Sequence, residues 1–172
     1  MIERLIDSIT SDWGHANILS QYRGRSGRER VLIFLRATYD RARTEPDALR
    51  LLYALFFEAL GPVPELRARI VQFHRDQHAG LAQSVRRGLK DRSIVAGRSP
   101  DREADLIVAQ VRGVAYQWCL DPEQNDHVRA LAYVIEATEQ RLAPPEEPAA
   151  TSAGNRVSPA PRTTRRRKQA PV

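Results

Sequence analysis

Apolar residues recur at three- and four-residue intervals through most of the first 143 positions. This spacing places them on one face of a helix and predicts amphipathic α-helices. No segment alternates apolar and polar residues over more than a few positions, so the pattern predicts no β-strand. Six helices are expected, over about residues 2–19, 26–42, 46–60, 64–92, 99–120 and 121–142.

Several of these helices carry start or stop signals in the sequence. Ser26 and Glu29 have the spacing of a capping box, in which two residues satisfy each other's backbone N–H groups. A Gly-Pro pair at 61–62 is a strong stop signal, and a Ser-Pro pair at 99–100 is a typical helix start. The expected fold is an all-α, antiparallel bundle of about six helices that occupies residues 1–143.

The last two expected helices carry apolar residues on two opposite faces. A helix that is apolar on two sides is buried on two sides, and a chain of this size has few other helices to cover the second faces. We therefore expect a homodimer in which these helices pair with the same helices of a second copy. The alternative is a larger monomeric core with these helices at its centre. The expected interface residues are Leu106, Ala109, Gly113, Leu120, Ala130, Tyr133 and Ala137.

Aromatic residues with a few polar neighbours gather on the second, third and fourth expected helices. Convergent aromatic side chains with a small number of polar groups are what a small-molecule pocket needs. The alternative is that these aromatic residues only fill the core, although polar residues among them need partners that a ligand could supply. The expected ligand is a small apolar or aromatic molecule, and the expected pocket residues are Phe34, Thr38, Tyr53, Phe56, Phe57, Phe73, His74 and Gln77.

The composition divides the chain into one domain and a tail. Hydrophobic residues make up 42% of the 172 positions, which is enough for one core. The net charge is +6, and residues 144–172 carry +4 of it through six basic and two acidic residues. This segment is rich in proline and has no aromatic residue, so we expect it to be disordered. The segment contains a basic run of Arg165, Arg166, Arg167 and Lys168. Either these side chains are simply solvated or they make weak, nonspecific contacts to nucleic-acid phosphates.

The sequence also argues against several classes of protein. No apolar run approaches the roughly 18 residues of a membrane helix, and the charged N-terminus is not a signal peptide. Cys119 is the single cysteine and cannot form an internal disulfide, which favours a cytoplasmic location. His74 and His78 share a helix face, but two ligands fall short of a zinc site, so neither a metal nor another cofactor is expected. No catalytic motif or phosphate-binding glycine loop occurs, so we do not expect an enzyme.

Two segments resemble parts of TetR-family transcriptional regulators. PELRARIVQFHRDQHAGLAQSVRRGLKDRSI is similar to their long central helix. Their last two helices are similar to the segment ADLIVAQVRGVAYQWCLDPEQNDHVRALAYVIEATEQRL. The similar features follow one another as Gly113, Gln-Trp at 117–118, and Leu-Asp-Pro at 120–122 before a final amphipathic helix. The resemblance covers residues 1 to about 143 and depends mainly on the order and lengths of the helices.

The resemblance implies a dimer that responds to a small molecule bound between its central helices. In that family a DNA-binding domain of about 50 residues with a helix-turn-helix precedes the ligand-binding domain. In that family a helix links the two domains, and Met1 of this chain falls at a position within that helix. The chain is therefore either a natural relative without the DNA-binding domain or a truncated one. We expect a ligand-binding domain that recognises no specific DNA sequence by itself. The alternative is an interaction module that forms mixed dimers with a full-length regulator.

Overall fold

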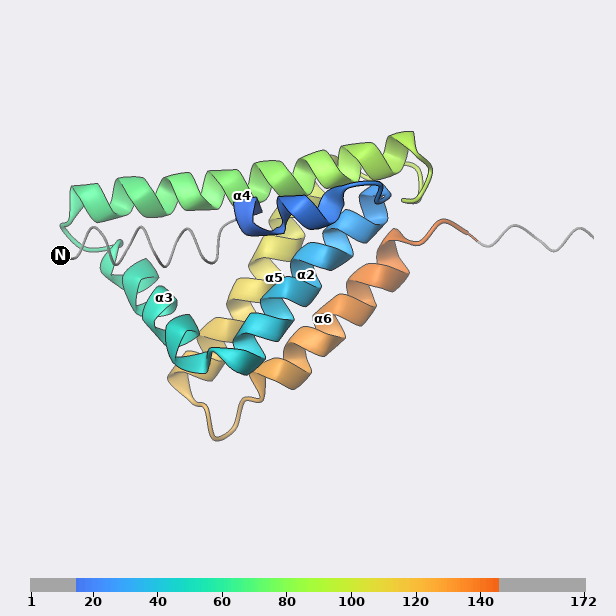
Figure 1. Cartoon of the computed structure of the whole chain (residues 1–172). Coiled ribbons are helices and arrows are strands. Elements are labelled where there is room, and N and C mark those ends of the chain that lie inside the picture. The colour runs from blue at the N-terminus through green and yellow to red at the C-terminus, as the bar shows by residue number, and fades with distance from the viewer. Residues whose placement is uncertain (1–14, 146–172) are drawn as a thin grey trace, which may run out of the picture.

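The computed structural model describes residues 15–145, which form helices joined by short loops (Figure 1). No strand occurs within these residues, and the expected all-α class is confirmed. The elements are a 3-10 helix, η1 (His15–Tyr22), and five α-helices, α2 (Gly27–Thr44), α3 (Pro46–Glu58), α4 (Pro64–Lys90), α5 (Pro100–Leu120) and α6 (His127–Leu142).

The expected first helix differs from the structure in its described part. Residues 15–22 form a 3-10 helix, which is common in short connecting segments, and not an α-helix that ends at Leu19. Ile18 and Tyr22 of η1 are buried against α2 and α4. The residues before His15, and the tail from residue 146 with its basic run, lie outside the described residues.

The helices form a bundle that is closed on one side by the long α4. Helix α6 lies beside both α2 and α5, and α3 runs from the end of α2 back to the start of α4 (Figure 1). Helix α4 contacts α2 and α5, whereas α6 contacts α2 and α5 but not α4. The main core lies where these helices meet and includes the fully buried side chains Val31, Leu35, Leu81, Val85 and Ile107.

The start of α2 is fixed against the end of α4 by a close backbone crossing. The capping box of Ser26 and Glu29 is present, which confirms the expected helix start. A Cβ atom on Gly27 would lie 1.9 Å from the backbone nitrogen of Gly88, so only glycine permits this approach. The backbone N–H of Gly27 also donates to Asp91 Oδ2 at 2.9 Å, in the loop after α4. The two helices are therefore held together at this end by packing and by hydrogen bonding.

Helix α6 begins later than the Asp-Pro pair at 121–122 suggested. The carbonyl oxygen and the carboxylate of Asp121 accept hydrogen bonds from the backbone N–H groups of Asn125 and Gln124, which closes a turn over this segment. Asp126 then caps α6 by accepting from the N–H of Arg129 at 2.9 Å. The second aspartate, Asp126, is the N-cap because the first, Asp121, is used in the turn.

A buried carboxylate ties the start of α5 to the end of α6. Glu103 is 6% exposed and forms ion pairs with Arg98, at 3.4 Å, and with Arg141. Arg98 also donates to the backbone oxygen of Arg141 at 3.0 Å. A buried carboxylate requires such partners, so this cluster fixes the relative position of the two helices.

Candidate functional site

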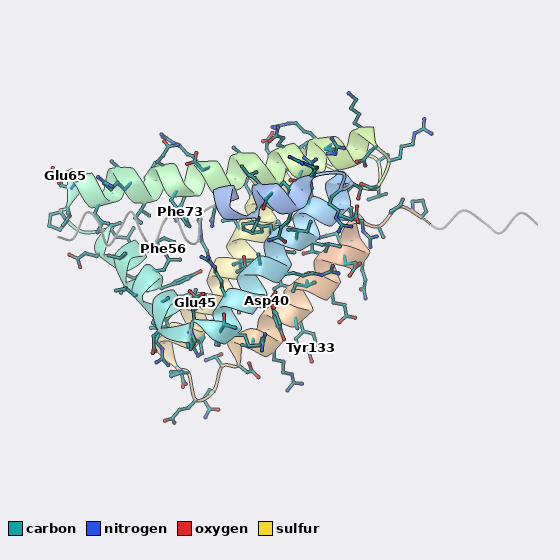
Figure 2. The ribbon with its side chains drawn as sticks, in the orientation of Figure 1. Asp40, Glu45, Phe56, Glu65, Phe73 and Tyr133 are labelled. Carbon is teal, nitrogen blue, oxygen red and sulfur yellow. The ribbon has the colours of Figure 1, made fainter. Side chains whose placement is uncertain are left out.

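A small cavity lies between α3, α4 and α5, with contributions from α2 and α6. Its volume is about 40 Å³, measured as the space open to the centres of water molecules. In Figure 2, Phe56 on α3 and Phe73 on α4 lie in the region where these two helices face each other. The cavity is lined by Phe34, Thr38, Leu49, Leu52, Tyr53, Phe56, Phe73, Gln77, Val108, Val111, Arg112, Ala115 and Leu131.

Aromatic rings from α3 and α4 form one wall of the cavity. The ring centroid of Phe56 lies 5.1 Å from that of Tyr53 and 5.9 Å from that of Phe73. These distances are within the range of favourable aromatic contacts. Helix periodicity brings the rings together, because Tyr53 and Phe56 are three residues apart on α3 and so share a face.

The polar groups of the cavity come from four helices. Burial raises the pKa of Tyr53, so its phenol remains protonated and can both donate and accept a hydrogen bond. Thr38 donates to the backbone oxygen of Phe34 at 3.0 Å and keeps its own acceptor capacity. Arg112 Nη2 donates to Gln77 Oε1 at 3.5 Å. The cavity is thus apolar over most of its surface, with a few polar groups to orient a ligand.

His74 lies beside the cavity and does not line it. Its ring meets the edge of Phe56 at a centroid distance of 5.0 Å. Burial, together with the charge on Arg112, lowers the pKa of His74 to about 4, so the imidazole is neutral at pH 7. Within residues 15–145, its buried Nε2 has no hydrogen-bond partner.

Most of the expected pocket residues meet at the cavity. Six of the eight line it, namely Phe34, Thr38, Tyr53, Phe56, Phe73 and Gln77. Phe57 lies elsewhere, because it is 44% exposed and its ring packs on Tyr116 at 5.6 Å. The sequence interpretation missed the contribution of α5, whose residues at 108, 111, 112 and 115 share one face by their three- and four-residue spacing.

The expected interface residues form an exposed surface on α5 and α6, here called the α5–α6 face. The side chains of Leu106, Leu120 and Tyr133 are 43%, 66% and 56% exposed, although they are large and apolar. Figure 2 shows Tyr133 pointing away from the bundle. A shallow groove between the two helices is lined in part by Val114 and Tyr133, so the two helices present one continuous face. The face comprises Leu106, Ala109, Gly113, Leu120, Ala130, Tyr133 and Ala137.

Other titratable residues lie outside the lining of the cavity. His78, from the histidine pair on α4, has its Nε2 atom 3.1 Å from Asp105 Oδ1. Burial raises the pKa of Cys119, which keeps the thiol protonated. Within residues 15–145, no group of three or more histidine, cysteine or acidic residues is placed to hold a metal ion. None of the helices in this part of the chain is long and apolar enough to cross a membrane.

Residues 15–145 thus combine an all-helical bundle, a small and partly open cavity and an exposed two-helix face. Residues 27–143 match the family described as BetI-type transcriptional repressor, C-terminal, and the chain belongs to this family. The match begins at the first residue of α2 and ends one residue after α6, so it includes the cavity and the α5–α6 face. No curated protein and no solved structure matches the chain significantly. C-terminal domains of TetR-type regulators typically dimerise and bind small ligands.

Proposed function

We propose that this domain senses a small apolar or aromatic molecule in the cavity and forms a homodimer through the α5–α6 face. The observation that carries the proposal is the position of α5. Its residues at 108, 111, 112 and 115 line the cavity, whereas Gly113 lies on the exposed face of the same helix. A ligand that displaces α5 would therefore change the surface through which two copies meet.

The size of the cavity supports a mechanism in which the ligand moves the helices. A volume of about 40 Å³ has room for about three water molecules. Sites for drug-sized ligands measure roughly 300–1,000 Å³. Binding of such a ligand requires part of the cavity wall, for example α3 or α5, to move outward, and the ligand favours the expanded state because it binds that state more tightly. The proposed function of the domain is regulatory.

The exposed α5–α6 face also supports a second candidate function. A surface of this kind can pair with the corresponding face of a related chain as well as with a second copy. The domain would then form mixed dimers with a full-length regulator and reduce its active concentration. Native mass spectrometry after co-expression with a helix-turn-helix relative distinguishes the two functions, because only mixed pairing gives a heterodimer mass.

Gln77→Leu tests the cavity as the ligand site. The substitution keeps the side-chain volume and removes the amide that faces the cavity. Compounds that raise the Tm of the parent protein should lose about 1 kcal/mol of binding free energy, which is the usual value of one hydrogen bond. Gln83→Leu, at an exposed position of the same helix, is the matched control and should bind like the parent. Equal ligand affinity in the parent and Gln77→Leu would place the ligand outside this cavity.

A further inference from the structure

Arg112 is the one charged residue among the thirteen that line the cavity. It is half-buried on α5, and nine of the other lining residues are aliphatic or carry only an aromatic hydrocarbon ring. Burial lowers its pKa, which means that the surroundings penalise the positive charge. An arginine in such a place needs a compensating partner, and buried charges in proteins are normally paired.

Within residues 15–145, no aspartate or glutamate forms an ion pair with Arg112. Its contacts are to neutral groups, with Gln77 Oε1 at 3.5 Å and the ring centroid of Phe56 at 5.8 Å from the guanidinium carbon. A guanidinium group carries five N–H donors in a rigid planar fork. Gln77 receives one weak hydrogen bond from this fork, and its length of 3.5 Å exceeds the usual range of about 2.7–3.2 Å.

We propose that the cavity takes an amphipathic ligand whose carboxylate pairs with Arg112 while its apolar part packs on the aromatic wall. This inference rests on the proposed function and specifies the class of ligand. A carboxylate matches the planar guanidinium fork with two parallel hydrogen bonds. A phosphate group carries more charge and more acceptors than this single cation and the neutral groups around it can satisfy.

An aromatic wall is also a feature of sites that bind cationic ligands. Tyr53, Phe56 and Phe73 could in principle surround a quaternary ammonium group, because such groups bind to the faces of aromatic rings. Here the guanidinium of Arg112 already lies over the ring of Phe56, at 5.8 Å from its centroid. A second cation in the cavity would meet a like charge in a region of low dielectric. The arrangement therefore disfavours cations and favours anions.

The test compares probes that differ only in their charged or polar end. Two sets are used, 3-phenylpropanoate with 3-phenylpropanamide and 3-phenylpropylammonium, and hexanoate with hexanamide and hexylammonium. Isothermal titration calorimetry and Tm measurements at pH 7 are made on the full 172-residue chain. The carboxylate in at least one set should bind about 10- to 100-fold more tightly than the amide, which is the range for a hydrogen bond to a charged group. The ammonium compound should bind least.

Three variants show whether Arg112 causes the preference. Arg112→Met keeps the length of the apolar stem and removes the charge, so carboxylate binding should fall to the level of the amide. Arg112→Lys keeps the charge and should retain part of the preference, without the two-point geometry. Arg102→Met removes an exposed arginine from the same helix and is the control for the change in net charge. It should bind the carboxylate like the parent.

The outcomes separate this inference from the proposed function. If an amide or ammonium probe binds in the cavity as tightly as the carboxylate, the anion preference is wrong and ligand sensing stands. The inference is also wrong if the carboxylate preference survives in Arg112→Met. If no probe of any charge binds to the parent or changes its Tm, both the inference and the proposed function are overturned.

Discussion

Replacing Gly113 with leucine would test the proposed dimer face without disturbing the protomer. Within the described protomer, a Cβ atom at this position has no heavy atom within 4 Å outside its own stretch of helix. The residue is exposed in the middle of α5, where exchanging glycine for leucine raises helix stability by about 0.8 kcal/mol. The fold of Gly113→Leu should therefore be as stable as that of the parent, or slightly more stable.

The same change should weaken the dimer. The absence of a side chain at Gly113 allows another helix backbone to approach. Bulk added to a well-packed contact costs about 1–3 kcal/mol. This cost corresponds to an increase of about 5- to 150-fold in the dimer dissociation constant.

Analytical ultracentrifugation over a dilution series measures this constant, and Tm values at low protein concentration measure the stability of the protomer. Ala79→Leu, at an exposed position of α4 away from the α5–α6 face, is the control and should leave both quantities unchanged. A parent chain that is monomeric at micromolar concentration would refute the proposed dimer. An unchanged dissociation constant in Gly113→Leu would show that the two copies meet through a different surface.

Two further substitutions test the buried charged and titratable groups. Glu103→Gln should lower the free energy of unfolding by about 1–3 kcal/mol in urea denaturation, because Arg141 loses its anionic partner; no change would show that the pair is not stabilising. His74→Leu should lose less stability than the parent between pH 6.5 and pH 4.5. Burial lowers the pKa of His74 to about 4, so between these pH values the imidazole takes up a proton mainly in the unfolded parent. The free energy of unfolding of the parent therefore decreases as the pH is lowered. Urea denaturation at both pH values measures the difference, and equal losses would contradict the effect of His74.

Helix boundaries were predictable where the signal is local. The capping box at Ser26 and the prolines at 46 and 100 act within a few residues, and the helices start at these places. At residues 121–126 two aspartates compete for the N-cap position, and the hydrogen bonds that Asp121 accepts from the backbone of the turn leave this position to Asp126. Such a choice depends on how the preceding turn closes, which periodicity does not reveal.

The cavity was predictable only in part, because side-chain direction depends on where neighbouring helices pack. Phe56 and Phe57 are adjacent and similar in sequence, yet Phe56 lines the cavity and Phe57 packs on Tyr116 near the surface. The position of Arg112 in the cavity wall was missed because a charged residue on an amphipathic helix normally faces water. Its position on the same face as Val108 and Val111 was a usable signal, because a charge within an apolar stripe requires an explanation.

Adjacent residues of α5 connect the two proposed activities of the domain. Arg112 lines the cavity and Gly113 lies on the α5–α6 face, because adjacent residues of an α-helix point about 100° apart. An α-helix that is packed along its length moves as a unit, and a ligand that needs more than about 40 Å³ has to displace some part of the cavity wall. In the proposed mechanism that displacement changes the dimer, and by linkage the dimer must change ligand affinity by the same factor. Gly113→Leu, which should weaken the dimer without touching the cavity, should therefore lower ligand affinity if ligand strengthens the dimer and raise it if ligand weakens the dimer. Independent behaviour of the two equilibria would show that α5 does not couple them.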